Sequence, residues 1–155
     1  MRILRTAVVG AGKMGALHAR VYSQLPDSRL TAVVDTDAAR AHSLAQQYGC
    51  EALTDPKDLL GRVDAVTIST PTAAHYPLAK LFLENRIPVL IEKPLASTVE
   101  EGRQIVELAR RTQTVVAVGH SERCNPVVQA MKRLKIEPRF IEADRVSPYP
   151  FRSSD

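Results

Sequence analysis

The sequence has few of the residues that form metal sites, disulfide frameworks or single-strand nucleic-acid sites. Only 2 of its 155 residues are cysteines and only 4 are histidines. Cys50 and Cys124 form no C-x-x-C pair, and the histidines form no H-x-x-x-H pair, so we expect neither a metal site nor a disulfide framework. Aromatic residues make up 5% of the chain, and the basic residues behind its formal net charge of +4 are scattered. We therefore expect no nucleic-acid partner.

Long apolar runs are also absent. No run approaches the roughly 20 residues that a helix needs to cross a bilayer, so we expect no membrane partner. The N-terminal stretch MRILRTAVVG leads directly into a glycine turn and offers no small-residue cleavage site, which predicts a strand rather than a signal peptide. With 45% hydrophobic and 25% charged residues, the composition is typical of a globular protein. We expect a cytoplasmic location.

The apolar residues that are present follow an alternation of strands and helices. We predict strands over 5–9, 29–35, 50–53, 63–69, 87–92 and 114–120. We predict helices over 14–25, 38–49, 74–85, 97–112 and 125–135, and a single helical turn over 55–60. Strands that are apolar throughout, between amphipathic helices, favour a parallel sheet covered on both faces. Right-handed crossovers then give an α/β fold with a doubly wound, mostly parallel sheet of the Rossmann type.

Three details of the helices depend on particular residues. The first helix is predicted from four apolar residues at helical spacing, which are Met14, Leu17, Val21 and Leu25. Asp37 is expected to cap the second helix and Gly49 to end it. Ser97 precedes Glu100 by three residues, which predicts a capping box at the start of the helix over 97–112.

The last part of the chain has a different pattern. The segment 139–147 alternates like a strand, and Pro148 and Pro150 then interrupt it. A single strand cannot form a domain, and its edges need a partner. The sequence therefore predicts a first domain over 1–120, a connecting helix over 121–137 and the beginning of a second domain over 138–155.

Three glycines follow the first predicted strand and precede the first helix. Gly10, Gly12 and Gly15 have the spacing G-x-G-x-x-G. In this context Gly10 permits a tight turn, Gly12 lets the backbone approach a pyrophosphate, and Gly15 lets the helix pack closely. The alternative is that the glycines only form a turn. Asp35 lies twenty residues after Gly15, close to the spacing of a group that hydrogen-bonds a ribose 2′-hydroxyl, and its alternative role is a helix cap shared with Asp37.

Together the glycines and Asp35 favour a bound adenine dinucleotide. S-adenosylmethionine, which uses a similar glycine turn, is the alternative. No G-K-[ST] follows the glycines, which excludes a Walker-type phosphate site. The Asp35 carboxylate favours NAD over NADP because it repels a 2′-phosphate. Arg40 is the opposing signal, since its guanidinium would offset that repulsion if it turned back.

The fourth and fifth predicted strands end in chemically distinctive segments. These are STPTAAH, residues 69–75, and EKP, residues 92–94. In a doubly wound sheet the reactive part of a dinucleotide lies beside these strand ends. Lys93 is placed to serve as a proton donor or as an electrostatic clamp on a substrate hydroxyl. The alternative is an ordinary loop lysine that is ion-paired with Glu92.

The stretches GAGKMGALHARVY, ISTPTAAHYPLA, LIEKPLAST and VGHSERCNPVV together resemble the N-terminal half of the Gfo/Idh/MocA oxidoreductase family. The resemblance implies hydride transfer between a nicotinamide cofactor and a hydroxyl-bearing carbon of a sugar, an inositol or a nucleotide-sugar. By position in the family's motifs it implies that Lys93 is catalytic. It also implies a set of cofactor-binding residues: Gly10, Gly12, Met14, Gly15, Asp35, Thr70, Pro71, His75, Glu92, Lys93, Arg123 and Asn125.

The resemblance further implies a second, α+β domain. In family members that domain carries a D-x-x-x-H motif, whose histidine works beside the lysine of the EKP segment. The sequence ends at Asp155, so we expect only the beginning of this domain and little or no turnover by the chain alone. We expect His120 to be a packed or capping histidine and not a replacement. A homo-oligomer is expected, and the alternatives are a non-catalytic NAD-binding module and a fragment that self-associates through 139–147.

Overall fold

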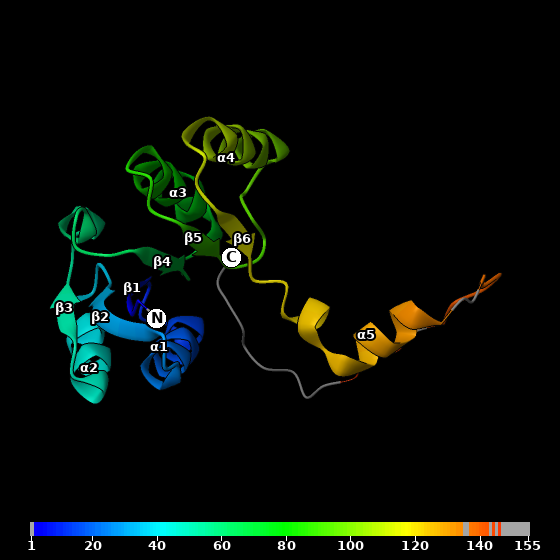
Figure 1. Cartoon of the computed structure of the whole chain (residues 1–155), viewed down its shortest axis with the longest axis horizontal. Helices are drawn as coiled ribbons and strands as arrows, with labels where there is room; N and C mark the ends of the chain where they lie inside the picture. The colour runs from blue at the N-terminus through cyan, green and yellow to red at the C-terminus, as the bar shows by residue number, and fades with distance from the viewer. Residues whose placement is uncertain (1, 135–136, 143, 145, 147–155) are drawn as a thin grey trace. The chain divides into compact units, whose positions relative to one another are not determined.

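The computed structural model describes residues 2–134, 137–142, 144 and 146. The chain divides into two compact units, Met1–Gly119 and His120–Asp155. In its described part the first unit has one sheet, with the strand order β3-β2-β1-β4-β5-β6 (Figure 1). The strands are β1 Leu4–Val9, β2 Ser28–Val34, β3 Glu51–Leu53, β4 Ala65–Ile68, β5 Val89–Ile91 and β6 Val116–Val118. All neighbouring strands are parallel, which confirms the predicted α/β doubly wound sheet.

Helices cover both faces of this sheet. They are α1 Lys13–Gln24, α2 Ala38–Tyr48, α3 His75–Glu84 and α4 Val99–Thr112, with short 3-10 turns η1 Pro56–Leu59 and η2 Thr72–Ala74. α1 and α2 pack on one face, and α3 and α4 on the other (Figure 1). Val8 of β1 is buried under the first pair, whereas Ala7 and Val9 are buried under the second. Because successive strand residues point to opposite faces, this double cover favours apolar residues at consecutive positions of a strand.

The apolar stripe that predicts α1 is not its buried face. Gly15 and Ala19 are the buried residues of this helix. Small residues on that side let the helix axis approach the sheet closely, and the larger apolar side chains then point outward. Four such side chains are between 39% and 46% exposed: Met14, Leu17, Val21 and Leu25.

The helix caps agree with the prediction at α2 and differ from it at α4. Asp37 caps α2, and Gly49 ends it in the left-handed conformation. α4 does begin with a capping box, but its members are Thr98 and Glu101, whose side chains each accept the other's backbone N–H at 3.1 Å. The S/T-x-x-E pattern occurs in two adjacent registers, and the helix uses the second. The prediction that placed the box one residue earlier, at Ser97 and Glu100, was wrong.

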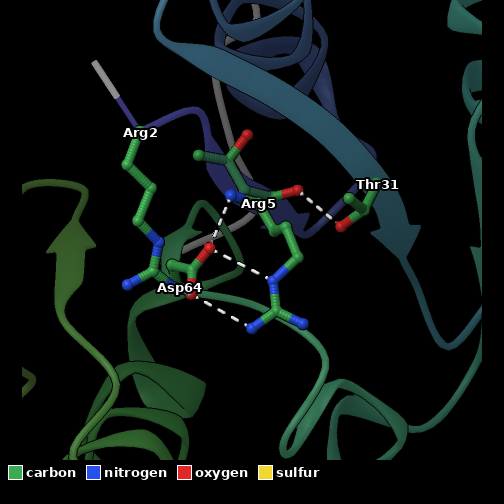
Figure 2. A network of polar contacts seen from close by, with 5 residues as sticks. Arg2, Arg5, Thr31 and Asp64 are labelled. Atoms are coloured by element: carbon green, nitrogen blue, oxygen red, sulfur yellow. Dashed lines mark hydrogen bonds and ion pairs between the residues drawn. The ribbon is translucent and has the colours of Figure 1, made fainter.

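An ion-pair cluster lies at the amino edge of the sheet, where the parallel strands begin. The Asp64 carboxylate accepts hydrogen bonds from the Arg5 backbone N–H at 2.8 Å, from Arg5 Nε at 3.1 Å and Nη2 at 3.0 Å, and from Arg2 Nη2 at 2.8 Å (Figure 2). The side-chain hydrogen bonds from Arg5 are the main cause that lowers the pKa of Asp64 from 3.8 to about 2. This cluster ties the start of β1 to the start of β4.

The second unit contains the 3-10 turn η3, Ser121–Cys124, and the helix α5, Pro126–Arg133. Asn125 caps α5 by accepting the Val127 N–H at 2.9 Å. No strand occurs at residues 137–142, 144 or 146, and the other residues of the strand predicted over 139–147 lie outside the described part, as do Pro148 and Pro150. Among the helices of the described ranges, none is long and apolar enough to cross a membrane.

Candidate functional site

The predicted site residues of the first unit follow four neighbouring strands at the carboxyl edge of the sheet. Gly10 follows β1, Asp35 follows β2, Thr70 comes two residues after β4, and Glu92 follows β5. β1 lies between β2 and β4, so the chain leaves it toward one side and later returns on the other. At such a switch in strand order the loops diverge and leave a crevice for a ligand.

The three positions of the turn are occupied by glycine for different structural reasons. Gly10 has a φ of 103°, and a Cβ there would lie 2.6 Å from the Ser69 carbonyl oxygen. A Cβ on Gly15 would lie 1.7 Å from the Gly10 carbonyl oxygen. A Cβ on Gly12 would meet nothing within 4 Å. The fold therefore requires Gly10 and Gly15, whereas Gly12 leaves open space beside the backbone, which a ligand phosphate can use.

The first turn of α1 has no side-chain cap. Gly12 occupies the cap position and offers no side-chain acceptor, and the first turn contains no acidic residue. By contrast, side chains cap α2, α4 and α5. The first N–H groups of a helix lack intrahelical partners and carry a partial positive charge, so an uncapped start attracts an anion. Met14 lies in this first turn and is 42% exposed.

Asp35 joins the end of β2 to the glycine turn. Its Oδ2 accepts the Ala11 N–H at 2.7 Å, and its Oδ1 accepts the Asp37 N–H at 2.9 Å. Asp37, and not Asp35, caps α2. Both partners of Asp35 are backbone groups, and each carboxylate oxygen keeps further acceptor capacity for a ribose hydroxyl. Arg40 Nε lies 3.1 Å from Asp37 Oδ2 and so pairs with the cap.

A hollow lies beside Ala11, whose N–H donates to Asp35. Its volume is about 400 Å³, and its lining residues are Ala11, Ala39, Arg40, Ser43, Leu44 and Gln47.

The loop after β4 contains an unsatisfied hydroxyl and a buried histidine. Thr70 Oγ1 is the one buried side-chain nitrogen or oxygen in the described part of the chain that has no hydrogen-bond partner. His75 is 1% exposed; its Nε2 lies 3.0 Å from the Thr70 carbonyl oxygen and its Nδ1 lies 2.9 Å from the Pro94 carbonyl oxygen. Pro71, which is exposed, precedes η2. The His75 ring therefore links the loops that follow β4 and β5.

Glu92 and Lys93 do not form the ion pair that the sequence leaves open as an alternative. Glu92 Oε1 lies 2.8 Å from His18 Nε2, and Glu92 Oε2 accepts the Lys93 backbone N–H at 3.3 Å. The exposed Lys93 ammonium has no hydrogen bond or ion pair with any residue that the structure describes. The Lys93–Pro94 peptide bond is cis. The head group of Lys93 is thus available to a ligand.

His18 is a residue that the sequence did not single out. It lies on α1, three residues after Gly15, so both belong to the side of the helix that faces the sheet. This spacing was the available signal, because the residue one turn beyond the third glycine points toward the strand ends. Its partner Glu92, which follows β5, could not be identified from spacing.

Arg123 and Asn125 belong to the second unit. Asn125 caps α5, and its Nδ2 donates to Glu122 Oε2 at 2.7 Å. Arg123 is exposed, and its carbonyl oxygen accepts a hydrogen bond from the Gln129 side chain. Their cofactor-binding role stays a prediction. Over the ranges that the structure describes, no group of three or more His, Cys, Asp or Glu residues is placed to hold a metal ion.

The open space at Gly12, the uncapped α1 and the Asp35 carboxylate fit the phosphates and a ribose of a dinucleotide. With the strand order, they define the class of the first unit as a Rossmann-type dinucleotide-binding domain. Residues 4–120 match the model of the Gfo/Idh/MocA family, an oxidoreductase family with an NAD-binding Rossmann fold. The chain belongs to this family.

Named relatives support the same assignment. The chain is 36% identical over 153 residues to UDP-N-acetylglucosamine 3-dehydrogenase of Acidithiobacillus ferrooxidans. This match covers 98% of this chain and 48% of that protein. The solved structure of that enzyme has a TM-score of 0.81 at 35% identity, over 86% of this chain and 44% of that chain. Inositol 2-dehydrogenase of Rubrobacter xylanophilus is 39% identical over 133 residues, 83% of this chain and 38% of that protein.

A structure with a bound cofactor is also similar. GenD2 from gentamicin A biosynthesis, solved in complex with NAD, has a TM-score of 0.75 at 35% identity, over 77% of this chain and 35% of that chain. The chain spans less than half the length of the relatives it matches.

Proposed function

We propose that this chain is the NAD(H)-binding part of a dehydrogenase that moves a hydride between the nicotinamide and a hydroxyl-bearing ring carbon. The observation that carries the proposal is the 2.7 Å hydrogen bond from the Ala11 N–H to Asp35. This bond holds a carboxylate with spare acceptor capacity directly beside the glycine turn and the uncapped first turn of α1. Phosphates are expected at α1 and the adenosine ribose at Asp35.

The catalytic part of the proposal rests on Lys93. The nicotinamide, when bound, accepts or delivers the hydride. The Lys93 side chain has no partner in the described part of the chain: as an ammonium it gives the proton to the substrate oxygen, and as a neutral amine it takes the proton from the substrate hydroxyl. Thr70, Pro71, His75 and Glu92 shape the loops around this position. A cofactor-binding role for Arg123 and Asn125 remains a prediction.

The substrate class is a sugar, an inositol or a nucleotide-sugar. It is supported by the names of the relatives, which are a UDP-N-acetylglucosamine 3-dehydrogenase and an inositol 2-dehydrogenase. Because the chain spans less than half of their length, we expect weak or absent turnover of myo-inositol or UDP-N-acetylglucosamine by the chain alone. The homo-oligomeric state and the cytoplasmic location remain predictions, and the solution mass checks the first.

NAD is expected to bind more tightly than NADP. The Asp35 carboxylate lies where it accepts hydrogen bonds from a free ribose 2′-hydroxyl and repels a 2′-phosphate. The cation that would offset this repulsion is Arg40, and it is paired with Asp37 at 3.1 Å.

Calorimetric titration with NADH and NADPH tests the proposal, because the chain has no tryptophan to report binding by fluorescence. The decisive variant is Gly12→Ala. The added methyl group fits the cofactor-free chain but occupies the space expected for the pyrophosphate. We expect saturable NADH binding by the wild type and at least tenfold weaker binding by Gly12→Ala. Gly102→Ala in α4, where the Cβ would make an ordinary 3.7 Å contact with Leu95, is the matched control and should bind normally. Absence of NADH binding by the wild type would contradict the proposal.

A further inference from the structure

The turn that carries Lys93 is held on both sides by histidines. The residue before Lys93, Glu92, is bonded to His18, and the carbonyl of the residue after it, Pro94, is bonded to His75. His18 comes from α1 and His75 from the first residue of α3, and these helices cover opposite faces of the sheet. Two contacts from separate helices therefore converge on three consecutive residues.

The contact on the Glu92 side is enclosed. The side chains of His18 and Glu92 are 19% and 13% exposed, and Nε2 and Oε1 are 2.8 Å apart. A Cβ on Gly119 would lie 2.9 Å from Glu92 Oε1, so the absence of a side chain at this position makes room for the carboxylate. Glu92 is confined between α1 and the end of β6.

The contact on the Pro94 side uses the whole His75 ring. The ring is 1% exposed, and each of its nitrogens faces a backbone carbonyl oxygen, of Thr70 or of Pro94. A carbonyl oxygen only accepts, so each ring nitrogen that carries a hydrogen donates to the carbonyl that it faces. Neither nitrogen is left for a cofactor. His75 joins two loops, while the Lys93 ammonium between the two braced residues has no partner in the described part.

We propose that His18 and His75 are positioning residues for Lys93, and that they act through Glu92 and Pro94. The inference rests on the proposed function for the role of Lys93. The histidines fix the backbone on either side of the lysine, so that its free ammonium is held over one place at the carboxyl edge. Preorganised supporting contacts of this kind keep a reactive group within the small range of positions that catalysis requires.

Two substitutions of His75 separate positioning from a role in folding. In His75→Asn the amide nitrogen replaces Nδ1 and retains the bond to Pro94, and in His75→Gln the amide nitrogen replaces Nε2 and retains the bond to Thr70. Each variant keeps one amide donor in the same buried place, toward Pro94 in His75→Asn and toward Thr70 in His75→Gln. A role in folding alone predicts no selective effect on Lys93. Positioning of Lys93 predicts that His75→Gln has the stronger effect, because it releases Pro94.

The first readout is the ¹⁵N relaxation of the Lys93 amide in the cofactor-free chain. We expect an order parameter near the rigid value of about 0.85 in the wild type and in His75→Asn, and below about 0.6 in His75→Gln. For the His18–Glu92 contact, His18→Gln keeps an N–H that reaches Glu92, so the Lys93 amide should remain rigid. In His18→Leu the Lys93 amide should become mobile. Equal order parameters in the Asn and Gln variants of His75 would overturn the proposal, whether or not the chain binds NADH.

The second readout is NADH affinity with and without the lysine head group. His75→Gln should weaken NADH binding about fivefold in the wild-type background and less than twofold in a Lys93→Met background, because the effect acts through Lys93. The same loss in both backgrounds would contradict the proposal even if NADH binding itself is normal. Failure of the wild type to bind NADH would instead contradict the proposed function, and the relaxation data would still decide the role of the histidines.

Discussion

The two edges of the sheet each hold an aspartate, and the two aspartates have opposite kinds of partner. At the amino edge, Asp64 is surrounded by the guanidinium groups of Arg5 and Arg2. At the carboxyl edge, Asp35 is held by two backbone N–H groups and, among the residues that the structure describes, by no cation. Arginine forks occupy both oxygens of a carboxylate and neutralise it, whereas single N–H bonds fix its position and leave its charge and further lone pairs for a ligand.

The two edges of the sheet also differ in the hollow that each borders and in the groups that build it. The amino edge borders a larger hollow, of about 570 Å³, than the one of about 400 Å³ beside Ala11. The size of a hollow therefore does not locate the candidate site here. The carboxyl edge is built mainly from backbone contacts and glycines, and the amino edge from charged side chains. Substitutions at the two edges should accordingly affect different measurements.

The largest effect is expected where a side chain is added to the backbone contacts of the carboxyl edge. In Gly15→Ala the new Cβ would lie 1.7 Å from the Gly10 carbonyl oxygen, so α1 must move away from the turn. We expect a loss of more than about 3 kcal/mol in the free energy of unfolding. Chemical denaturation measures it, with Gly12→Ala as the matched control that should stay within about 0.5 kcal/mol of the wild type. Similar stability of the two variants would show that the turn is looser than described.

The next effect separates the two aspartates directly. Asp35→Ala should weaken NADH binding at least tenfold, or about 1.4 kcal/mol, because it removes the proposed acceptor for the ribose hydroxyls. Asp64→Ala, at the opposite edge, should change NADH affinity less than twofold. Calorimetric titration of both variants gives the comparison. A large effect of Asp64→Ala on affinity, or none of Asp35→Ala, would remove the distinction between the edges.

A smaller effect concerns the stability that the amino edge provides. The pKa of Asp64 is lowered to about 2 in the folded chain, so the unfolded chain binds a proton at Asp64 more readily. Its contribution is therefore complete above pH 4 and is lost as the pH falls toward 2. We expect Asp64→Asn to cost about 1 kcal/mol at pH 7, since the Arg2 and Arg5 side chains are 76% and 44% exposed, and this difference should shrink between pH 4 and pH 2. Denaturation at several pH values tests this, with Glu107→Gln on α4 as a control.

Most of the first unit could be predicted from the sequence because its pattern is local. Apolar runs gave the strands, and the glycine spacing gave the turn. The predicted strands over 63–69 and 114–120 were longer than the observed Ala65–Ile68 and Val116–Val118, because the sequence pattern does not show where pairing with the neighbouring strands stops. The outward stripe of α1 was not predictable, since only packing on the sheet makes Gly15 and Ala19 the close-contact residues.

The site could be predicted only where spacing along the chain carries the information. The distance from Gly15 to Asp35 predicted the acid that we propose to bind the ribose. The bond between His18 and Glu92 joins residues 74 apart in the chain, and the bond between His75 and Pro94 joins residues 19 apart. Both depend on which strands are neighbours at the edge, and spacing does not reveal that. The motif predicted a role for Lys93, whereas the contacts of His18 and His75 beside it were not predicted.

The smallest effect concerns cofactor choice beside Asp35. Arg40 is paired with Asp37, which also caps α2. Asp37→Asn keeps a good helix cap but removes the charge that holds the guanidinium, so Arg40 becomes free to approach a 2′-phosphate. We expect NADPH to bind about two- to threefold more tightly and NADH affinity to stay unchanged, measured by parallel titrations. The double variant Asp37→Asn with Arg40→Ala should lose the gain, because the guanidinium provides it. A gain that survives in the double variant would mean that the Asp37 charge repels the phosphate directly, and that the paired Arg40 has no part in selecting the cofactor.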